Sequence, residues 1–179
     1  MNIEVEVRSF ISKEQYNRLL AFFLKTASHQ GLDEQETHYF DGKADVRIQK
    51  NKHFAKIWMK GGKMHEEARK ETEIKVPVED FAKLQDVFAA LGFKTTVKWF
   101  RSRHAFNWND LAVTVDYNKG YGYILELEKM ATEATKDSTL KVLKEKMAEL
   151  EISITPKEEF DRAYAHYVSN WEKLTADNS

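Results

Sequence analysis

Strand-like segments in which apolar and charged residues alternate recur along most of this chain, and they constrain its fold more than any other feature. In residues 3–10 the alternation is strict, with apolar residues on one side and charged residues on the other. Seven further segments are predicted as strands, at residues 35–41, 45–50, 53–60, 68–76, 93–108, 111–117 and 121–129. Dipeptides such as Asp41-Gly42 between them are typical of tight hairpins. The pattern predicts eight strands, each with one apolar and one charged face.

Four amphipathic segments with helical spacing accompany these strands. Ser12 begins a capping box with Gln15, which predicts a helix from there to about residue 28. Further helices are predicted at residues 81–91, before Gly92, and at residues 137–150. A fourth begins after Thr155, where Thr-Pro-Lys-Glu is a second capping box with proline at the first helical position.

The helices need apolar surfaces to cover, and the apolar faces of the strands are the available partners. A sheet of eight strands also curls, and closure would remove its exposed edges. We therefore predict an α+β fold: a closed eight-stranded antiparallel barrel over residues 3–129, with helices packed outside and the C-terminal helices at residues 137–173. No linker or repeat divides the chain, so residues 1–179 are predicted to form one domain.

Composition narrows the functional classes. The chain has 28 Lys or Arg and 29 Asp or Glu among 179 residues, a formal charge of −1, which argues against binding nucleic acid through bulk charge. It has no cysteine, which excludes disulfides, thiolate catalysis and cysteine-based metal sites. No apolar run approaches about 18 residues, and the N-terminal residues do not form a signal peptide, so no membrane partner and a cytoplasmic location are expected. Whether the chain forms a homodimer is open.

The charged strand faces point to the function. The simplest alternative is that they are the solvated faces of an ordinary sheet. If the sheet closes, however, they line the lumen of the barrel. Carboxylates and cations together are expensive to bury without ligands. A metal-bound polyphosphate would satisfy both, because carboxylates bind a divalent ion and cations bind phosphate oxygens.

Six segments of the sequence together resemble the strand motifs of the CYTH superfamily. They are Glu4-x-Glu6-x-Arg8, Val46-Arg47-Ile48-Gln49, Trp58-Met59-Lys60-Gly61-Gly62, Arg69-x-Glu71-x-Glu73, the basic segment 98–103, and Gly122-Tyr123-Ile124-Leu125-Glu126-Leu127-Glu128. This superfamily comprises the triphosphate tunnel metalloenzymes, among them inorganic triphosphatases, thiamine triphosphatases and class IV adenylate cyclases. The resemblance covers residues 3 to about 129.

The resemblance implies an eight-stranded tunnel that binds a triphosphate together with Mg²⁺ or Mn²⁺. It assigns carboxylates to the metal, and with Asp116 on a similar charged strand face the predicted metal set is Glu4, Glu6, Asp116, Glu126 and Glu128. The predicted substrate-binding set is Arg8, Arg47, Gln49, Lys56, Lys60, Arg69, Arg101 and Arg103. Glu71 and Glu73 are predicted to be catalytic, by orienting water, by organising the cations or by binding a second metal.

Two positions depart from the family pattern. Arg8 stands where the family usually has lysine, which keeps the charge but changes the geometry of its hydrogen bonds. Gln49 stands where the family usually has a second arginine, which removes a charged phosphate contact.

Three functions fit these residues. The favoured one is a metal-dependent phosphohydrolase that acts on inorganic triphosphate or an organic triphosphate. The second is a cyclase of the class IV type, which would convert ATP to cyclic AMP and pyrophosphate. The third is a non-catalytic polyphosphate-binding module, which the nearly complete set of acids disfavours, because binding phosphate requires only cations.

Overall fold

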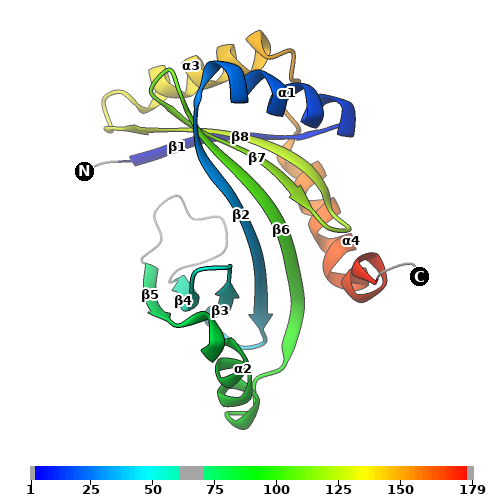
Figure 1. The fold of residues 1–179 in the computed structure, drawn as a ribbon. Coiled ribbons are helices and arrows are strands. Elements are labelled where there is room, and N and C mark those ends of the chain that lie inside the picture. The colour runs from blue at the N-terminus through cyan, green and yellow to red at the C-terminus, as the bar shows by residue number, and fades with distance from the viewer. Residues whose placement is uncertain (1–2, 61–70, 177–179) are drawn as a thin grey trace. The chain divides into compact units, whose positions relative to one another are not determined.

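A computed structural model describes residues 3–60 and 71–176 of the chain as an α+β fold (Figure 1). The strands are β1 (Ile3–Ile11), β2 (Ser28–Phe40), β3 (Asp45–Lys50), β4 (Ala55–Lys60), β5 (Glu71–Val76), β6 (Thr95–Trp108), β7 (Leu111–Asn118) and β8 (Gly122–Ala131). The helices are α1 (Lys13–Thr26), α2 (Phe81–Ala90), α3 (Lys136–Glu149) and α4 (Lys157–Thr175), and a 3-10 turn, η1, spans Val78–Asp80. Within these residues all the predicted strands and helices are present. No helix among them is long and apolar enough to cross a membrane.

The strands form one sheet in the order β1-β8-β7-β6-β2-β3-β4-β5. The prediction of a closed barrel is therefore wrong, because the sheet is open and β1 and β5 are its edges. That prediction assumed that an eight-stranded sheet must close to remove its edges. Charged side chains also protect an edge strand from pairing, and both edges carry them, as Glu4, Glu6 and Arg8 do on β1 and Glu73 and Lys75 do on β5.

The chain divides into two compact units. Unit 1 comprises Met1–Asp33 and Ser102–Tyr167, and unit 2 comprises Glu34–Arg101 and Val168–Ser179. The divisions fall inside β2, β6 and α4, rather than in linkers between elements.

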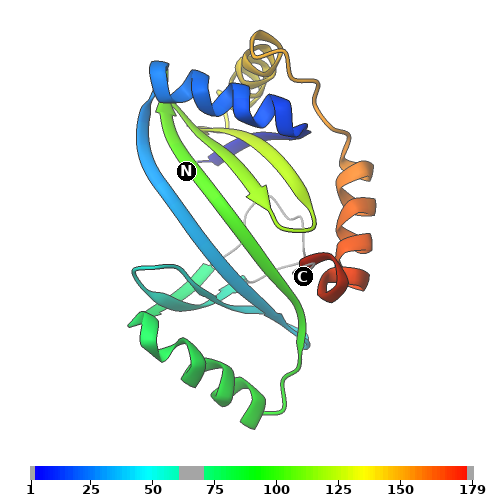
Figure 2. The ribbon, with the colours of Figure 1, turned by 45° about the vertical axis from the view of Figure 1, so that its right-hand side comes forward.

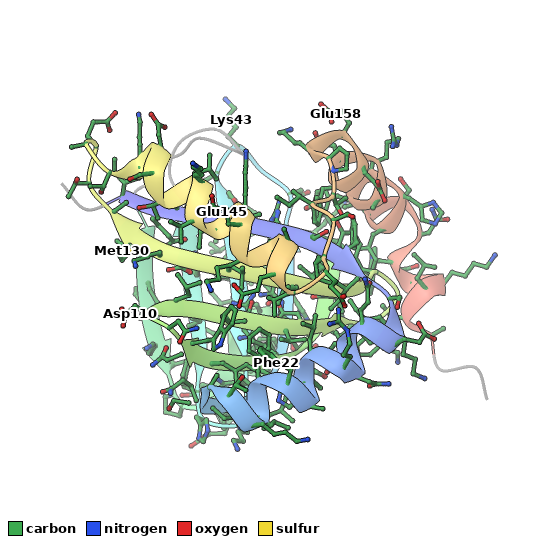
Figure 3. All side chains as sticks on the ribbon, turned by 90° about the horizontal axis from the view of Figure 1, so that it is seen from above. Phe22, Lys43, Asp110, Met130, Glu145 and Glu158 are labelled. Atoms are coloured by element: carbon green, nitrogen blue, oxygen red, sulfur yellow. The ribbon has the colours of Figure 1, made fainter. Side chains whose placement is uncertain are left out.

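In unit 1, α1 and α3 cover the apolar face of β1, β8 and β7. Figure 3 shows both helices lying across these strands, with Glu145 on α3 and Met130 on β8. The buried core joins strand residues Val7, Val113, Val115, Leu125 and Leu127 to Leu19 and Phe23 of α1 and Leu143 and Met147 of α3. Complete burial of a side chain such as Phe23 contributes about 1.5–3 kcal/mol. This packing fixes which face of each strand carries the charged residues.

In unit 2, α2 packs against β3 and β4 (Figure 2). Ile48 and Ala55 are buried there against Phe81 and Phe88 of α2. The ring of Phe88 stacks on Phe40 with centroids 4.3 Å apart. Since side chains alternate along a strand, the opposite face of β3 and β4 carries their charged and polar residues.

Local details confirm some expectations and change others. The Ser12 capping box is present, with Ser12 Oγ accepting from Gln15 N at 3.2 Å and Gln15 Oε1 accepting from Ser12 N at 2.8 Å.

Strand β2 begins at Ser28, seven residues before its predicted start at residue 35. Residues 28–33 lack an apolar alternation, so this extension depends on pairing with a neighbouring strand. The Thr155 hydroxyl, expected to cap α4, accepts a hydrogen bond from Phe10 N at 3.0 Å.

Candidate functional site

The four carboxylates that the resemblance assigns to a metal lie on one face of β1 and β8 in unit 1. Glu6 is paired with Glu128 across the two strands, and Arg8 is paired with Glu126. Glu4 lies two residues before Glu6 and shares its face. Helices α1 and α3 pack on the opposite face, so they do not cover these groups. Like charges directly opposite each other destabilise a sheet, and Glu6 with Glu128 is such a pair.

The pKa of Glu128 shows the effect of this crowding. Burial raises it above its usual value, and the nearby charges of Glu4, Glu126 and Glu6 raise it further, while Arg103 acts in the opposite direction. Within residues 3–60 and 71–176, no three acidic or histidine side chains are close enough to hold one metal ion. A face of this kind gains stability when it binds a cation.

Arg103 of β6 is held by Asp116 of β7. Its Nε donates to Asp116 Oδ1 at 3.0 Å, and its Nη2 donates to Asp116 Oδ2 at 2.7 Å. Burial lowers the pKa of Arg103, but the hydrogen bonds and charge of Asp116, together with Glu126 and Asp33, outweigh burial and raise it. Asp116 is 3% exposed. In this structure Asp116 therefore positions Arg103, and its assignment as a metal ligand stays a prediction.

Arg8 extends from β1 to the first part of α4. Its guanidinium carbon lies 4.7 Å from the centroid of the Phe160 ring. Phe160 also stacks on Phe10, with centroids 4.4 Å apart. A planar guanidinium stacks on an aromatic ring in a way that an ammonium cannot. This contact gives a physical reason for arginine at a position where the family usually has lysine.

Arg47 lies at the centre of a row of paired residues across unit 2. Tyr39 of β2, Arg47 of β3, Trp58 of β4 and Glu73 of β5 are successive neighbours in the register. The Arg47 guanidinium lies between the two rings, 4.4 Å from the Tyr39 centroid and 4.7 Å from the Trp58 centroid. Its Nε and Nη2 donate to the two oxygens of Asp45, each at 2.7 Å. Arg47 is thus held by Asp45 and by two aromatic rings of its own unit.

Gln49 lies on the same face of β3 as Arg47, as the sequence predicted. Its Nε2 donates to Thr37 Oγ1 at 2.9 Å and to Gln35 Oε1 at 3.3 Å. The amide therefore bonds to the polar residues of β2. An arginine here would have to reach past Thr37 or displace these two contacts.

Lys56 and Glu73 form an ion pair between β4 and β5. Lys56 Nζ donates to Glu73 Oε2 at 2.7 Å, and Lys75 Nζ lies 3.4 Å from Glu73 Oε1. The hydrogen bond from Lys56, with the charges of both lysines, lowers the pKa of Glu73. A carboxylate with a lowered pKa is a weak base. Of the predicted roles for Glu73, organising cations therefore agrees best with these contacts.

Four other predicted residues lie on β4, on β5, on β6 or outside the described residues. Lys60 and Glu71 are neighbours in the register of β4 and β5. Arg69 lies outside the described residues. Arg101 is half-buried on β6.

Sequence reasoning missed the residues that hold Arg47. Asp45 precedes Arg47 by two residues and so shares its strand face, which is a signal that the alternation alone could have supplied. Tyr39 gives no such signal, because its contact depends on the register between β2 and β3. On the unit 1 face, Thr114 lies opposite Glu126, and its buried hydroxyl has no hydrogen-bond partner in the described chain. It too was not predicted.

The model of one protein family, the CYTH domain, matches residues 2–165 of this chain. The chain belongs to the CYTH family. The sequence-based resemblance is thereby confirmed, and the match extends beyond the strands into α4.

Relatives and solved structures agree with membership in the CYTH family. A protein of Methanocaldococcus jannaschii, named as a candidate adenylate cyclase, is 30% identical over 164 residues, which are 84% of this chain and 91% of that protein. The structure of PH1012 from Pyrococcus horikoshii has a TM-score of 0.69 at 21% identity and covers 87% of this chain and 96% of that one. HpAC1 of Hippeastrum, a candidate adenylyl cyclase described as having a dominant triphosphatase activity, has a TM-score of 0.64 at 17% identity, with 91% and 96% covered.

Proposed function

We propose that this CYTH protein is a divalent-metal-dependent triphosphatase that releases orthophosphate from inorganic triphosphate or an organic triphosphate. The observation that carries this proposal is the excess of carboxylates on the β1–β8 face, where burial and then the neighbouring carboxylates raise the pKa of Glu128. Arg8 and Arg103 lie beside these carboxylates in the same unit. A surface that presents acids next to fixed guanidinium groups suits a metal-complexed phosphate.

The donor atoms of these residues suit a hard divalent cation, which would have to draw the carboxylates closer together than they lie in the described residues. Glu4, Glu6, Glu126 and Glu128 supply only carboxylate oxygens, which Mg²⁺ and Mn²⁺ prefer as ligands. The orphaned hydroxyl of Thr114, opposite Glu126, offers a further oxygen on that face. When bound there, the cation would neutralise charge on the phosphoryl group that is transferred.

The cationic side chains supply the phosphate contacts. Arg103 is fixed by two hydrogen bonds to Asp116, so little side-chain freedom is lost when it meets a phosphate. Arg8 is oriented by the Phe160 ring. Within unit 2, Arg47 and Lys56 are also among the predicted phosphate-binding residues, and each forms an ion pair with a carboxylate. Preorganised cations of this kind stabilise the charge that spreads over the phosphoryl oxygens in the transition state.

A cyclase activity is the second candidate, and its support is the name of the M. jannaschii relative. Cyclisation of ATP requires a pocket that orients adenine and ribose, and none of the contacts described here supplies one. The description of HpAC1 supports the hydrolase instead, since a dominant triphosphatase activity occurs there on a similar fold.

Phosphorus NMR of reactions with inorganic triphosphate, ATP and thiamine triphosphate would test the proposal. We expect orthophosphate to appear with Mg²⁺ or Mn²⁺ and to stop when excess EDTA is added. Glu126→Gln should lower kcat at least about a hundredfold without loss of folding, because it removes a ligand charge at constant volume. Glu145→Gln, on the exposed side of α3, is the matched control and should leave turnover unchanged.

Two results would contradict the hydrolase. Joint formation of pyrophosphate and cyclic AMP from ATP would establish the cyclase. Tight binding of triphosphate without turnover of any substrate would establish the non-catalytic module.

A further inference from the structure

Asp45 and Arg47 form a closely fitted ion pair within β3. Arg47 Nε donates to Asp45 Oδ1 and Arg47 Nη2 donates to Asp45 Oδ2, both at 2.7 Å. The Arg47 side chain is 13% exposed and the Asp45 side chain is 15% exposed, so solvent screens this pair less than it would a surface pair. The charge of Arg47 is thus largely balanced by a residue that lies outside the motifs of the family resemblance.

The remaining surfaces of the guanidinium are also occupied. Tyr39 and Trp58 lie within 4.7 Å of it, measured to their ring centroids. Arg47 Nη1 donates to Tyr39 Oη at 3.3 Å. The edge formed by Nε and Nη2 is one of those that arginine uses to bind two oxygens of a phosphate at once. In this structure a carboxylate occupies that edge.

We propose that Asp45 is an internal competitor for phosphate at Arg47 and that it limits the affinity of the protein for triphosphate. This inference rests on the proposed function. A carboxylate and a phosphate present the same pair of oxygens to the same guanidinium edge, so phosphate binding there is an exchange of one anion for another. When no substrate is bound, Asp45 pairs with the mostly buried guanidinium of Arg47 and balances its charge. Asp45 thereby lowers the affinity for triphosphate, while Arg47 keeps its positive charge.

Isothermal titration calorimetry of inorganic triphosphate into the 179-residue chain, with and without Mg²⁺, tests this proposal. Asp45→Asn removes the charge at constant volume, and we expect it to lower Kd about tenfold, because charge-assisted hydrogen bonds are roughly twice as strong as neutral ones. Asp45→Ser is a second neutral variant with the same expectation. Asp45→Glu retains a carboxylate and should stay within about threefold of the original affinity.

Two controls separate competition at Arg47 from a general effect of charge. Asp86→Asn makes the same charge change on the exposed part of α2 in the same unit, and it should leave Kd unchanged. A double-mutant cycle with Arg47→Gln should cancel the effect of Asp45→Asn, because no guanidinium remains to compete for. In steady-state kinetics, Asp45→Asn should lower KM without raising kcat, since tighter ground-state binding does not lower the barrier.

The outcomes are distinct. Weaker or unchanged binding in both neutral Asp45 variants, with melting temperatures showing that they fold, would overturn the proposal and make Asp45 a support for Arg47. Tightening that persists in the Arg47→Gln background would also overturn it. If neither the original protein nor any variant binds triphosphate, the proposed function itself fails. Binding by the original protein without tightening in the variants refutes only the role of Asp45.

Discussion

Replacing Glu36 by Gln should destabilise unit 2 in a way that depends on pH. Glu36 Oε1 lies 2.7 Å from Nε2 of the fully buried His38, and Glu36 Oε2 lies 2.9 Å from Lys50 Nζ. With Gln85 Nε2 donating to His38 Nδ1 at 3.0 Å, Nε2 carries the proton that Glu36 accepts. The hydrogen bond from His38, followed by the contact with Lys50, lowers the pKa of Glu36 from 4.5 to about 2.

The magnitude follows from that pKa. A fall from 4.5 to about 2 corresponds to about 3 kcal/mol of stability for a fully buried group. The Glu36 side chain is 24% exposed, so solvent screening reduces the expected value to about 1.5 kcal/mol. Because the pKa is lowered in the folded state, this stability is present above about pH 4.5 and is lost as the pH falls through about 2.

Urea denaturation followed by tryptophan fluorescence at several pH values would measure the effect. Glu36→Gln should lower the free energy of unfolding by about 1.5 kcal/mol at neutral pH, and the difference should shrink steadily below about pH 4.5. Glu145→Gln, which breaks an exposed pair at 3.9 Å, should change the free energy of unfolding by less than about 0.5 kcal/mol at any pH. A Glu36→Gln difference that is the same at neutral pH and at pH 3 would refute the reasoning.

Three other substitutions give separate tests. Glu128→Gln should raise the melting temperature by about 2–4 °C in metal-free buffer at pH 8, because it removes a half-buried charge that lies near other carboxylates and whose pKa is raised. A lower melting temperature would show that this charge is paired in the folded state. Asp116→Asn should lower the free energy of unfolding by about 2–4 kcal/mol, because Arg103 would lose the carboxylate with which it pairs directly. A loss under about 1 kcal/mol would mean that Arg103 turns to solvent or to another acidic residue. Gln49→Arg should lower KM for triphosphate about threefold to thirtyfold by adding a charged contact, and an unchanged KM alongside a severe loss in Arg47→Gln would show that Gln49 does not meet the phosphates.

Much of the candidate site follows from alternation along single strands. Since side chains on a strand change face at every residue, Glu126 and Glu128 must share a face, and so must Arg47 and Gln49. The structure places each pair in that way. Contacts that depend on pairing between strands were not predictable to the same degree. The hydrogen bonds of Asp116 with Arg103 on the neighbouring strand are one such contact.

The sequence by itself determined the elements and their faces. Capping residues such as Ser12, hairpin dipeptides and the two periodicities of apolar residues are local signals, and eight strands and four helices follow from them within the described residues. Only the tertiary structure decided that the sheet stays open, because closure depends on whether the distant strands β1 and β5 pair, and no local pattern encodes that. It also decided the early start of β2, because residues 28–33 carry no alternation of apolar residues, and β2 lies between β6 and β3 in the sheet. Likewise, the contacts of Tyr39 and Trp58 with Arg47 required the register of three strands, which is set when the apolar faces of the sheet pack.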